Sequence, residues 1–155
     1  MKAKTVYLLA GVLVGIFVVS PWERSPAAAT GPATIRITNV QDTVVRVDVG
    51  TKGKSPGDME IIRQRLFNTR LSTRPIGRSE LICTFVDRRR SRVCRGTYFL
   101  PKGRIVVGGS LLYRQFYELA VLGGTGVYNN AHGTLTVTRT ATGPTREVVL
   151  FRLVG

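Results

Sequence analysis

A glycine-rich stretch, LGGTGVYNNAHG, spans residues 122–133 and raises the possibility of a phosphate site. Loops of this kind bind phosphate where backbone N–H groups close on an anion. A dinucleotide-binding fingerprint needs a glycine where the chain has Asn129, and a P-loop needs a lysine that the stretch lacks. The pattern after the stretch is that of a strand, so no helix dipole is expected there. The stretch is therefore predicted to be a tight turn between two antiparallel strands.

His132, at the end of this turn, is the only histidine in the chain. Its side chain could act as an acid or a base near neutral pH. Its position after Asn129 and Asn130 favours a solvated turn histidine, and a catalytic role is the alternative. No metal site and no cofactor are predicted.

Two other polar side chains are predicted to face the interior. Gln64 shares the face of Ile62 and Leu66, the pattern of a buried amide that needs hydrogen-bond partners in an apolar wall. Tyr98 has the same parity as Cys94, which places it inside either as core filler or as a ligand contact.

The two cysteines, Cys83 and Cys94, fall in adjacent predicted strands. If the hairpin between them turns at Arg88 and Arg89, the two cysteines are directly opposed and within disulfide reach. A disulfide is therefore predicted, and a free lumenal thiol is the alternative.

The elements that must position these residues are short strands. Alternating and β-branched runs follow one another after residue 29, separated by turns rich in Gly and Pro, and helical periodicity is almost absent. Eight or nine strands without a helical crossover predict an all-β antiparallel sandwich or closed barrel. Some strands are apolar on both faces, which predicts a homo-oligomer. The runs are Thr34–Val40, Thr43–Val49, Met59–Phe67, Ile76–Val86, Arg92–Leu100, Arg104–Leu112, Phe116–Leu122, Gly133–Thr140 and Arg146–Val154.

The N-terminal segment differs from the rest of the chain. Lys2 and Lys4 precede an apolar run from Val6 to Val19, and small residues at 27–29 follow. This is the order of a secretory signal peptide, and the run is short for a membrane span. Residues 1–29 are predicted to be a signal peptide and residues 30–155 a single secreted domain.

The predicted domain is strongly basic, with 20 Lys and Arg side chains against 8 Asp and Glu, and 17 of the 20 are arginine. Such a surface attracts anionic polymers, or it is a solvated coat. The only dense cluster is Arg88–Arg90 with Arg92 and Arg95. Nucleic-acid modules usually interleave such clusters with aromatics, so no specific nucleic-acid partner is predicted.

The turn resembles a motif of the allene oxide cyclase and dirigent barrels. Upstream features follow the cyclase order over residues 56–140: Gly57-Asp58, Leu66-Phe67, Ile76-Gly77, Cys83, Gly96, Leu100-Pro101-x-Gly103-x-Ile105 and Gly108. The resemblance implies a calycin-like eight-stranded antiparallel β-barrel, often trimeric, with a ligand in its lumen. The motif residues here are Gly123, Gly124, Thr125, Gly126, Tyr128, Ala131 and Gly133.

The resemblance also implies lumenal positions. Where the cyclases carry a glutamate and an asparagine on their first strand, this chain offers Arg36 and Thr38, and Gln64 corresponds to their second-strand asparagine. Cys83 matches their lumenal cysteine, and His132 stands at the dirigent arginine. The ligand-lumen candidates are therefore Arg36, Gln64, Tyr98 and His132.

The family implies catalysis by confinement, an entropy trap in which an apolar lumen restricts conformers and a few polar groups favour one transition state. The expected function is binding of a small apolar molecule in the lumen, with an isomerase or cyclase as the enzymatic form. The alternative is a non-catalytic extracellular binding protein for a lipophile or an anionic cell-wall polymer. The expected oligomer is a trimer or a dimer.

Overall fold

The structure, a computed structural model, describes residues 32–68, 74–88, 91–112, 114–142 and 145–154. The predicted signal peptide, residues 1–29, lies outside the described residues. The part of the chain that the structure describes has no helix long and apolar enough to cross a membrane. Its eight strands are β1 (Ala33–Val47), β2 (Met59–Phe67), β3 (Gly77–Phe85), β4 (Ser91–Leu100), β5 (Gly103–Leu112), β6 (Phe116–Gly126), β7 (His132–Thr142) and β8 (Thr145–Val154).

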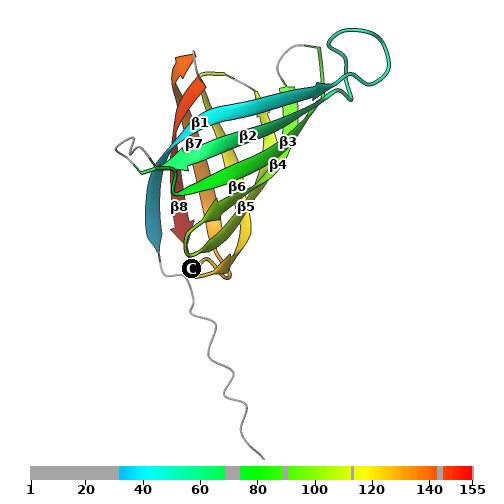
Figure 1. Cartoon of the computed structure of the whole chain (residues 1–155). Coiled ribbons are helices and arrows are strands. Elements are labelled where there is room, and N and C mark those ends of the chain that lie inside the picture. Colours follow the sequence, from blue (N-terminus) through cyan, green and yellow to red (C-terminus); the bar gives the residue numbers. More distant parts are fainter. Residues whose placement is uncertain (1–31, 69–73, 89–90, 113, 143–144, 155) are drawn as a thin grey trace, which may run out of the picture.

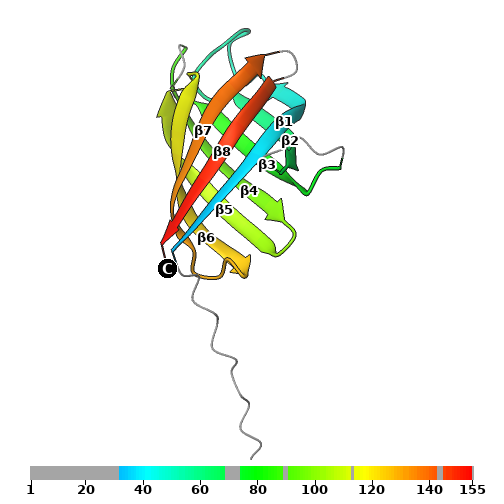
Figure 2. The same cartoon turned by 90° about the vertical axis from the view of Figure 1, so that its left-hand side faces the viewer.

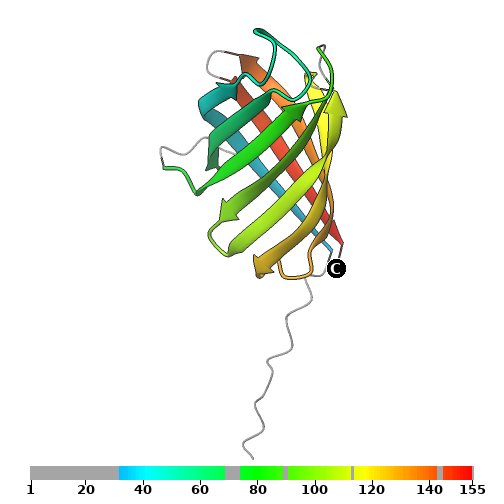
Figure 3. The same ribbon diagram turned by 90° about the vertical axis from the view of Figure 1, so that its right-hand side faces the viewer.

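The strands form a closed antiparallel barrel in chain order, with β1 pairing with β8 to complete it (Figure 1). Figure 2 shows the side that carries β7, β8 and β1, and Figure 3 shows the side that carries β3, β4 and β5. Closure removes the exposed edges that an open sheet would leave. The predicted eight-stranded all-β barrel is therefore confirmed.

The first strand corrects the sequence-based boundaries. The two runs predicted as separate strands are one strand of 15 residues, with a register shift between Gln41 and Thr43. A bulge inserts one residue, so the side chains that face inward change from odd-numbered to even-numbered positions. In the sequence this break in the alternation resembles a turn between two strands. Asn39 and Gln41 therefore share the inner face with Val44 and Arg46 beyond the bulge.

The hairpin of β3 and β4 has the predicted register. Cys83 is paired with Cys94, and the two form a disulfide, so no free cysteine is found in the described chain. The free-thiol alternative is therefore wrong. Arg89, predicted at the tip, lies outside the described residues.

The glycine-rich turn connects β6 to β7 at the end of the barrel where the chain termini of the domain lie. Gly133 has φ +139°, and a side chain there would meet the carbonyl oxygen of Arg152. A side chain at Gly124 would meet the carbonyl oxygen of Tyr128, whose N–H donates to Thr125 O at 3.2 Å. The glycines thus allow the turn to fold back closely on the barrel, as predicted.

This end of the barrel is filled by apolar side chains. The rings of Tyr98 and Phe151 meet edge to face, with centroids 5.0 Å apart. Ile105, Leu135 and Val149 pack with them and are fully buried. We call it the closed end, because its apolar side chains are buried and in contact with one another.

Candidate ligand-binding site

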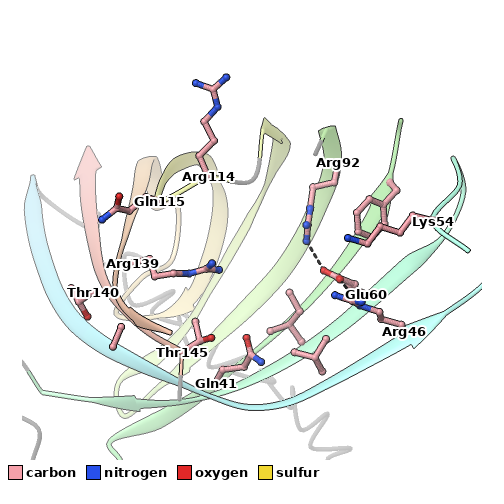
Figure 4. A pocket seen from close by; sticks show the side chains of 14 residues that line it. Gln41, Arg46, Lys54, Glu60, Arg92, Arg114, Gln115, Arg139, Thr140 and Thr145 are labelled. Carbon is pink, nitrogen blue, oxygen red and sulfur yellow. Dashed lines mark hydrogen bonds and ion pairs between the residues drawn. The ribbon is translucent and has the colours of Figure 1, made fainter. Parts of the chain in front are cut away.

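The opposite end of the barrel is open and holds a cavity of about 1120 Å³ (Figure 4). Its wall is formed by the ends of several strands and by two connections, β1–β2 with Lys54 and β5–β6 with Arg114 and Gln115. Cavities of this size accommodate small organic ligands. We call it the mouth cavity; its charged and polar lining includes Gln41, Arg46, Lys54, Glu60, Arg92, Arg114 and Arg139.

A narrow recess of about 20 Å³ lies against the mouth cavity and shares Gln41, Ile62 and Arg92 with it. Its other polar side chains include Tyr117 and Glu147. This volume is enough for one water molecule or one polar group of a ligand. A molecule in the mouth cavity could therefore place a single functional group against the buried Glu147.

Glu147 on β8 is the centre of a buried hydrogen-bond network and is 2% exposed. Its Oε2 accepts hydrogen bonds from Asn39 Nδ2 and Gln64 Nε2, both at 3.1 Å. Asn39 Nδ2 also donates to Gln64 Oε1 at 3.0 Å, and Ser79 Oγ donates to the same oxygen at 2.8 Å. The other carboxylate oxygen lies 3.7 Å from Arg139 Nη2. Amide donors and a guanidinium together compensate the cost of burying the charge and fix the carboxylate in place.

The charge of this carboxylate affects the pKa values of two nearby tyrosines. Burial, reinforced by the charge of Glu147, raises the pKa of Tyr98 and raises the pKa of Tyr117 well above the ordinary value. Both phenols therefore stay protonated at neutral pH and can donate a hydrogen bond. Tyr117 lines the recess beside Glu147, and a hydrogen bond between the two side chains is a further cause of its raised pKa.

Two buried oxygens of this region, the Tyr98 hydroxyl and Asn39 Oδ1, have no hydrogen-bond partner among the described residues. Leaving a buried polar group unsatisfied costs about 1–3 kcal/mol. A structure that tolerates two such groups around one carboxylate has residual hydrogen-bonding capacity in its lumen.

A second carboxylate, Glu60, stands on the wall of the mouth cavity. Its Oε2 lies 2.5 Å from Arg92 Nη1 and its Oε1 lies 2.9 Å from Arg46 Nε (Figure 4). The Arg92 guanidinium also lies over the ring of Phe85, 4.6 Å from its centroid. The Arg92 side chain is 8% exposed and lines both cavities, so it forms part of the boundary between them.

Two of the four predicted ligand-lumen candidates lie inside the barrel, and one of these two lines a cavity. Gln64 lines the recess, and Tyr98 is buried inside the barrel, where it contacts the core. The disulfide of Cys83 and Cys94 also lines the recess.

Arg36 and His132 lie elsewhere, which corrects their predicted position. Arg36 is exposed on the outer face of β1, because Ile35 and Ile37 take the inward positions of the pleat. His132 is exposed at the closed end, where its Nδ1 lies 2.8 Å from Asn130 O. The family turn motif of residues 123–133 is at that end too, so it shapes the fold and does not line the mouth cavity.

Sequence reasoning missed Asn39, Tyr117, Arg92 and Glu147 as site residues. The signal for two of them was present in the alternation of the strands. Asn39 continues the inward set of Ile35 and Ile37, and Glu147 shares the inner face with Val149. The lumenal carboxylate that the resemblance placed on the first strand is instead supplied by the last.

No protein-family model and no curated protein sequence matches the chain. Solved structures do match. A pyocyanin demethylase has a TM-score of 0.68 and 27% identity, with 79% of this chain and 100% of that chain covered. The pterocarpan synthase dirigent protein PsPTS1 has a TM-score of 0.62 and 14% identity, over 82% of this chain and 99% of that one.

The Diels–Alderase AbmU from Streptomyces koyangensis is also similar, with a TM-score of 0.62 and 16% identity over 78% of this chain and 64% of that chain. The class defined by the fold is therefore the closed eight-stranded antiparallel β-barrel, the fold that this dirigent protein also has. Pyocyanin demethylase and the Diels–Alderase have the same barrel fold.

Proposed function

We propose that the protein binds a small organic molecule in the mouth cavity, holds one of its polar groups in the recess against Glu147, and templates a cyclisation or isomerisation. The observation that supports this most strongly is the arrangement of an open cavity above a buried, hydrogen-bonded carboxylate. The apolar part of the ligand rests on Val44, Ile62 and Phe85, which line the same cavity.

Confinement supplies the rate enhancement in this proposal. A molecule held at both ends loses conformers before it reacts, so less entropy remains to be lost in the transition state. Glu147 accepts a hydrogen bond or a proton from the group in the recess, and Tyr117, which is hydrogen-bonded to Glu147, helps to hold the carboxylate in place. Asn39 and Gln64 are positioning residues, since they hold the carboxylate and do not line the mouth cavity.

The structural neighbours support this proposal. Their names describe a pterocarpan synthase dirigent protein, a Diels–Alderase and a demethylase. These are different reactions of organic molecules on one barrel, so the fold favours a small-molecule site without identifying the substrate.

We further infer that the protein is exported. The order of charged, apolar and small residues in positions 1–29 is that of a secretory signal. The disulfide between Cys83 and Cys94 agrees with an oxidising compartment.

A carrier without catalysis is the second candidate, and the open mouth and basic surface favour it. A carrier returns its ligand unchanged from both the wild type and Glu147→Gln. A catalyst forms a product with the wild type that the variant does not form, which mass spectrometry of the incubated ligand detects.

Binding is tested with a naphthol as a neutral probe that has one hydroxyl group. We expect calorimetric titration to show binding to the wild type and about tenfold weaker binding to Glu147→Gln, the effect of losing a hydrogen bond to a charged group. Glu80→Gln, on an exposed outer carboxylate, serves as the matched control and should leave the Kd unchanged. Absence of naphthol binding, or equal affinity of the wild type and Glu147→Gln, would contradict the proposed function.

A further inference from the structure

The charges around the mouth cavity are unbalanced, and this imbalance bears on the class of ligand. Glu60 is the only carboxylate among the described residues that line the cavity, and Glu147 lies beyond it in the recess. The cationic side chains on the lining outnumber these two groups. They are Arg46, Lys54, Arg92, Arg114 and Arg139.

Both carboxylates already have cationic neighbours within the protein. Glu60 is paired with Arg46 and Arg92, and Glu147 with Arg139. The two buried negative charges are therefore compensated before any ligand arrives, and they do not neutralise the remaining cations of the rim.

Lys54 and Arg114 supply the surplus positive charge. Lys54 belongs to the connection between β1 and β2, and Arg114 to the turn between β5 and β6, so two separate loops bring cations to one opening (Figure 4). Neither forms an ion pair with any carboxylate of the described chain. Two such cations beside a concave opening create a positive potential that attracts anions.

The wall below the rim has the opposite character. Val44, Ile62 and Phe85 present apolar surface to the cavity, and the recess beneath offers the Glu147 acceptor. A ligand that matches the rim, the wall and the recess has three parts. These are an anionic group at the rim, an apolar body along the wall and a hydrogen-bond donor at the end that enters the recess.

We propose that the natural ligand is a small amphiphilic organic anion, with a carboxylate, sulfonate or phosphate group held by Lys54 and Arg114. This rests on the proposed function, because it assumes that the mouth cavity is the ligand site. It adds the chemical class of the ligand and the direction in which it binds.

Matched naphthalene probes separate the two proposals. A naphthol has the donor alone, and a hydroxynaphthalenesulfonate has the donor and the anion on the same ring system. We expect the sulfonated probe to bind the wild type about three- to tenfold more tightly at low salt, the gain from two partly exposed ion pairs. This gain in affinity should shrink as the ionic strength rises, because salt screens the charges. The Debye length is about 10 Å at 0.1 M salt and becomes shorter at higher salt.

The double variant Lys54→Gln/Arg114→Gln is expected to remove this gain, so that it binds naphthol and the sulfonated probe with equal affinity. Arg36→Gln is the control for overall charge, since Arg36 is exposed on the outer face. It should retain the preference for the sulfonate.

Each outcome is decisive. Naphthol binding without any preference for the sulfonate overturns the anion proposal and leaves the proposed function standing. Failure of both probes to bind overturns both. A preference that survives in Lys54→Gln/Arg114→Gln, or that is lost equally in Arg36→Gln, also overturns the assignment of the anion to the rim.

Discussion

At the residue scale, the site depends on how the barrel compensates a buried carboxylate. Glu147 is held by the amides of Asn39 and Gln64 and approached by Arg139, so its position is fixed from three other strands. Removing one partner of such a group leaves unsatisfied polar atoms, which costs more than the hydrogen bond itself contributes. The amides are therefore expected to matter for stability as well as for ligand orientation.

Asp58, in the connection between β1 and β2, gives a prediction on pH. Its carboxylate accepts hydrogen bonds from the N–H groups of Val49 at 2.9 Å and Ser55 at 2.8 Å, and these lower its pKa below the ordinary 3.8. Because the pKa of Asp58 is lower in the folded state than in the unfolded chain, its carboxylate stabilises the fold at pH values above the unfolded pKa. That stabilisation is lost as pH falls through the folded pKa.

We therefore expect Asp58→Asn to be less stable than the wild type near neutral pH, with a difference that narrows below about pH 4. Urea unfolding followed by circular dichroism at several pH values measures it. Asp42→Asn, on an exposed carboxylate, is the control. A difference between Asp58→Asn and the wild type that stays constant across this pH range would refute the role of the hydrogen bonds.

At the element scale, period-2 alternation was enough to predict most of the barrel. The β3–β4 register followed from the opposition of Cys83 and Cys94, and seven of the nine predicted runs correspond to one strand each. The first strand was divided in two because a bulge reverses parity without any Gly or Pro to mark it. The residues of β2 that pair with β1 on either side of this bulge could therefore not be predicted from the local sequence pattern.

The site was harder to predict than the fold. Gln64 stood out as a polar residue in an apolar run, whereas Glu147 and Asn39 lie near the ends of the predicted runs 146–154 and 34–40, where polar residues usually reach solvent. That these two meet depends on β1 pairing with β8, a contact between the ends of the domain. Barrel closure, which no local pattern encodes, brings them into the lumen.

The disulfide ties β3 to β4 where both face the recess. We expect the double variant Cys83→Ser/Cys94→Ser to unfold with about 2–3 kcal/mol less free energy, the amount expected for closing a loop this short. Urea denaturation with and without a thiol reductant measures the effect. Reduction should lower the stability of the wild type and leave the variant unchanged; an equal response of both would show that the bridge does not contribute.

At the scale of the whole molecule, the two ends of the barrel differ in packing and in charge. The closed end, near the termini of the domain, is packed with apolar side chains and carries the glycine turn. The other end holds the mouth cavity, whose lining includes one carboxylate and five cationic side chains. One end is therefore closely packed, while the other holds an open cavity.

Assembly into a trimer or a dimer stays a prediction at this scale. Val148 and Leu150 on β8 are half-buried with outward parity, while Ile82 and Val93 are exposed on the other side of the barrel. These side chains offer apolar surface that a second copy of the chain could cover.

The most direct test of the ligand site is NMR mapping of amide chemical shifts during titration with the hydroxynaphthalenesulfonate probe. We expect the shifts to concentrate at the mouth, at residues such as Gln41, Ile62 and Glu147, with Leu135 and His132 at the closed end unaffected. Shifts confined to the outer face, around Ile82 and Val93, or no shifts at all, would contradict a ligand site in the mouth cavity.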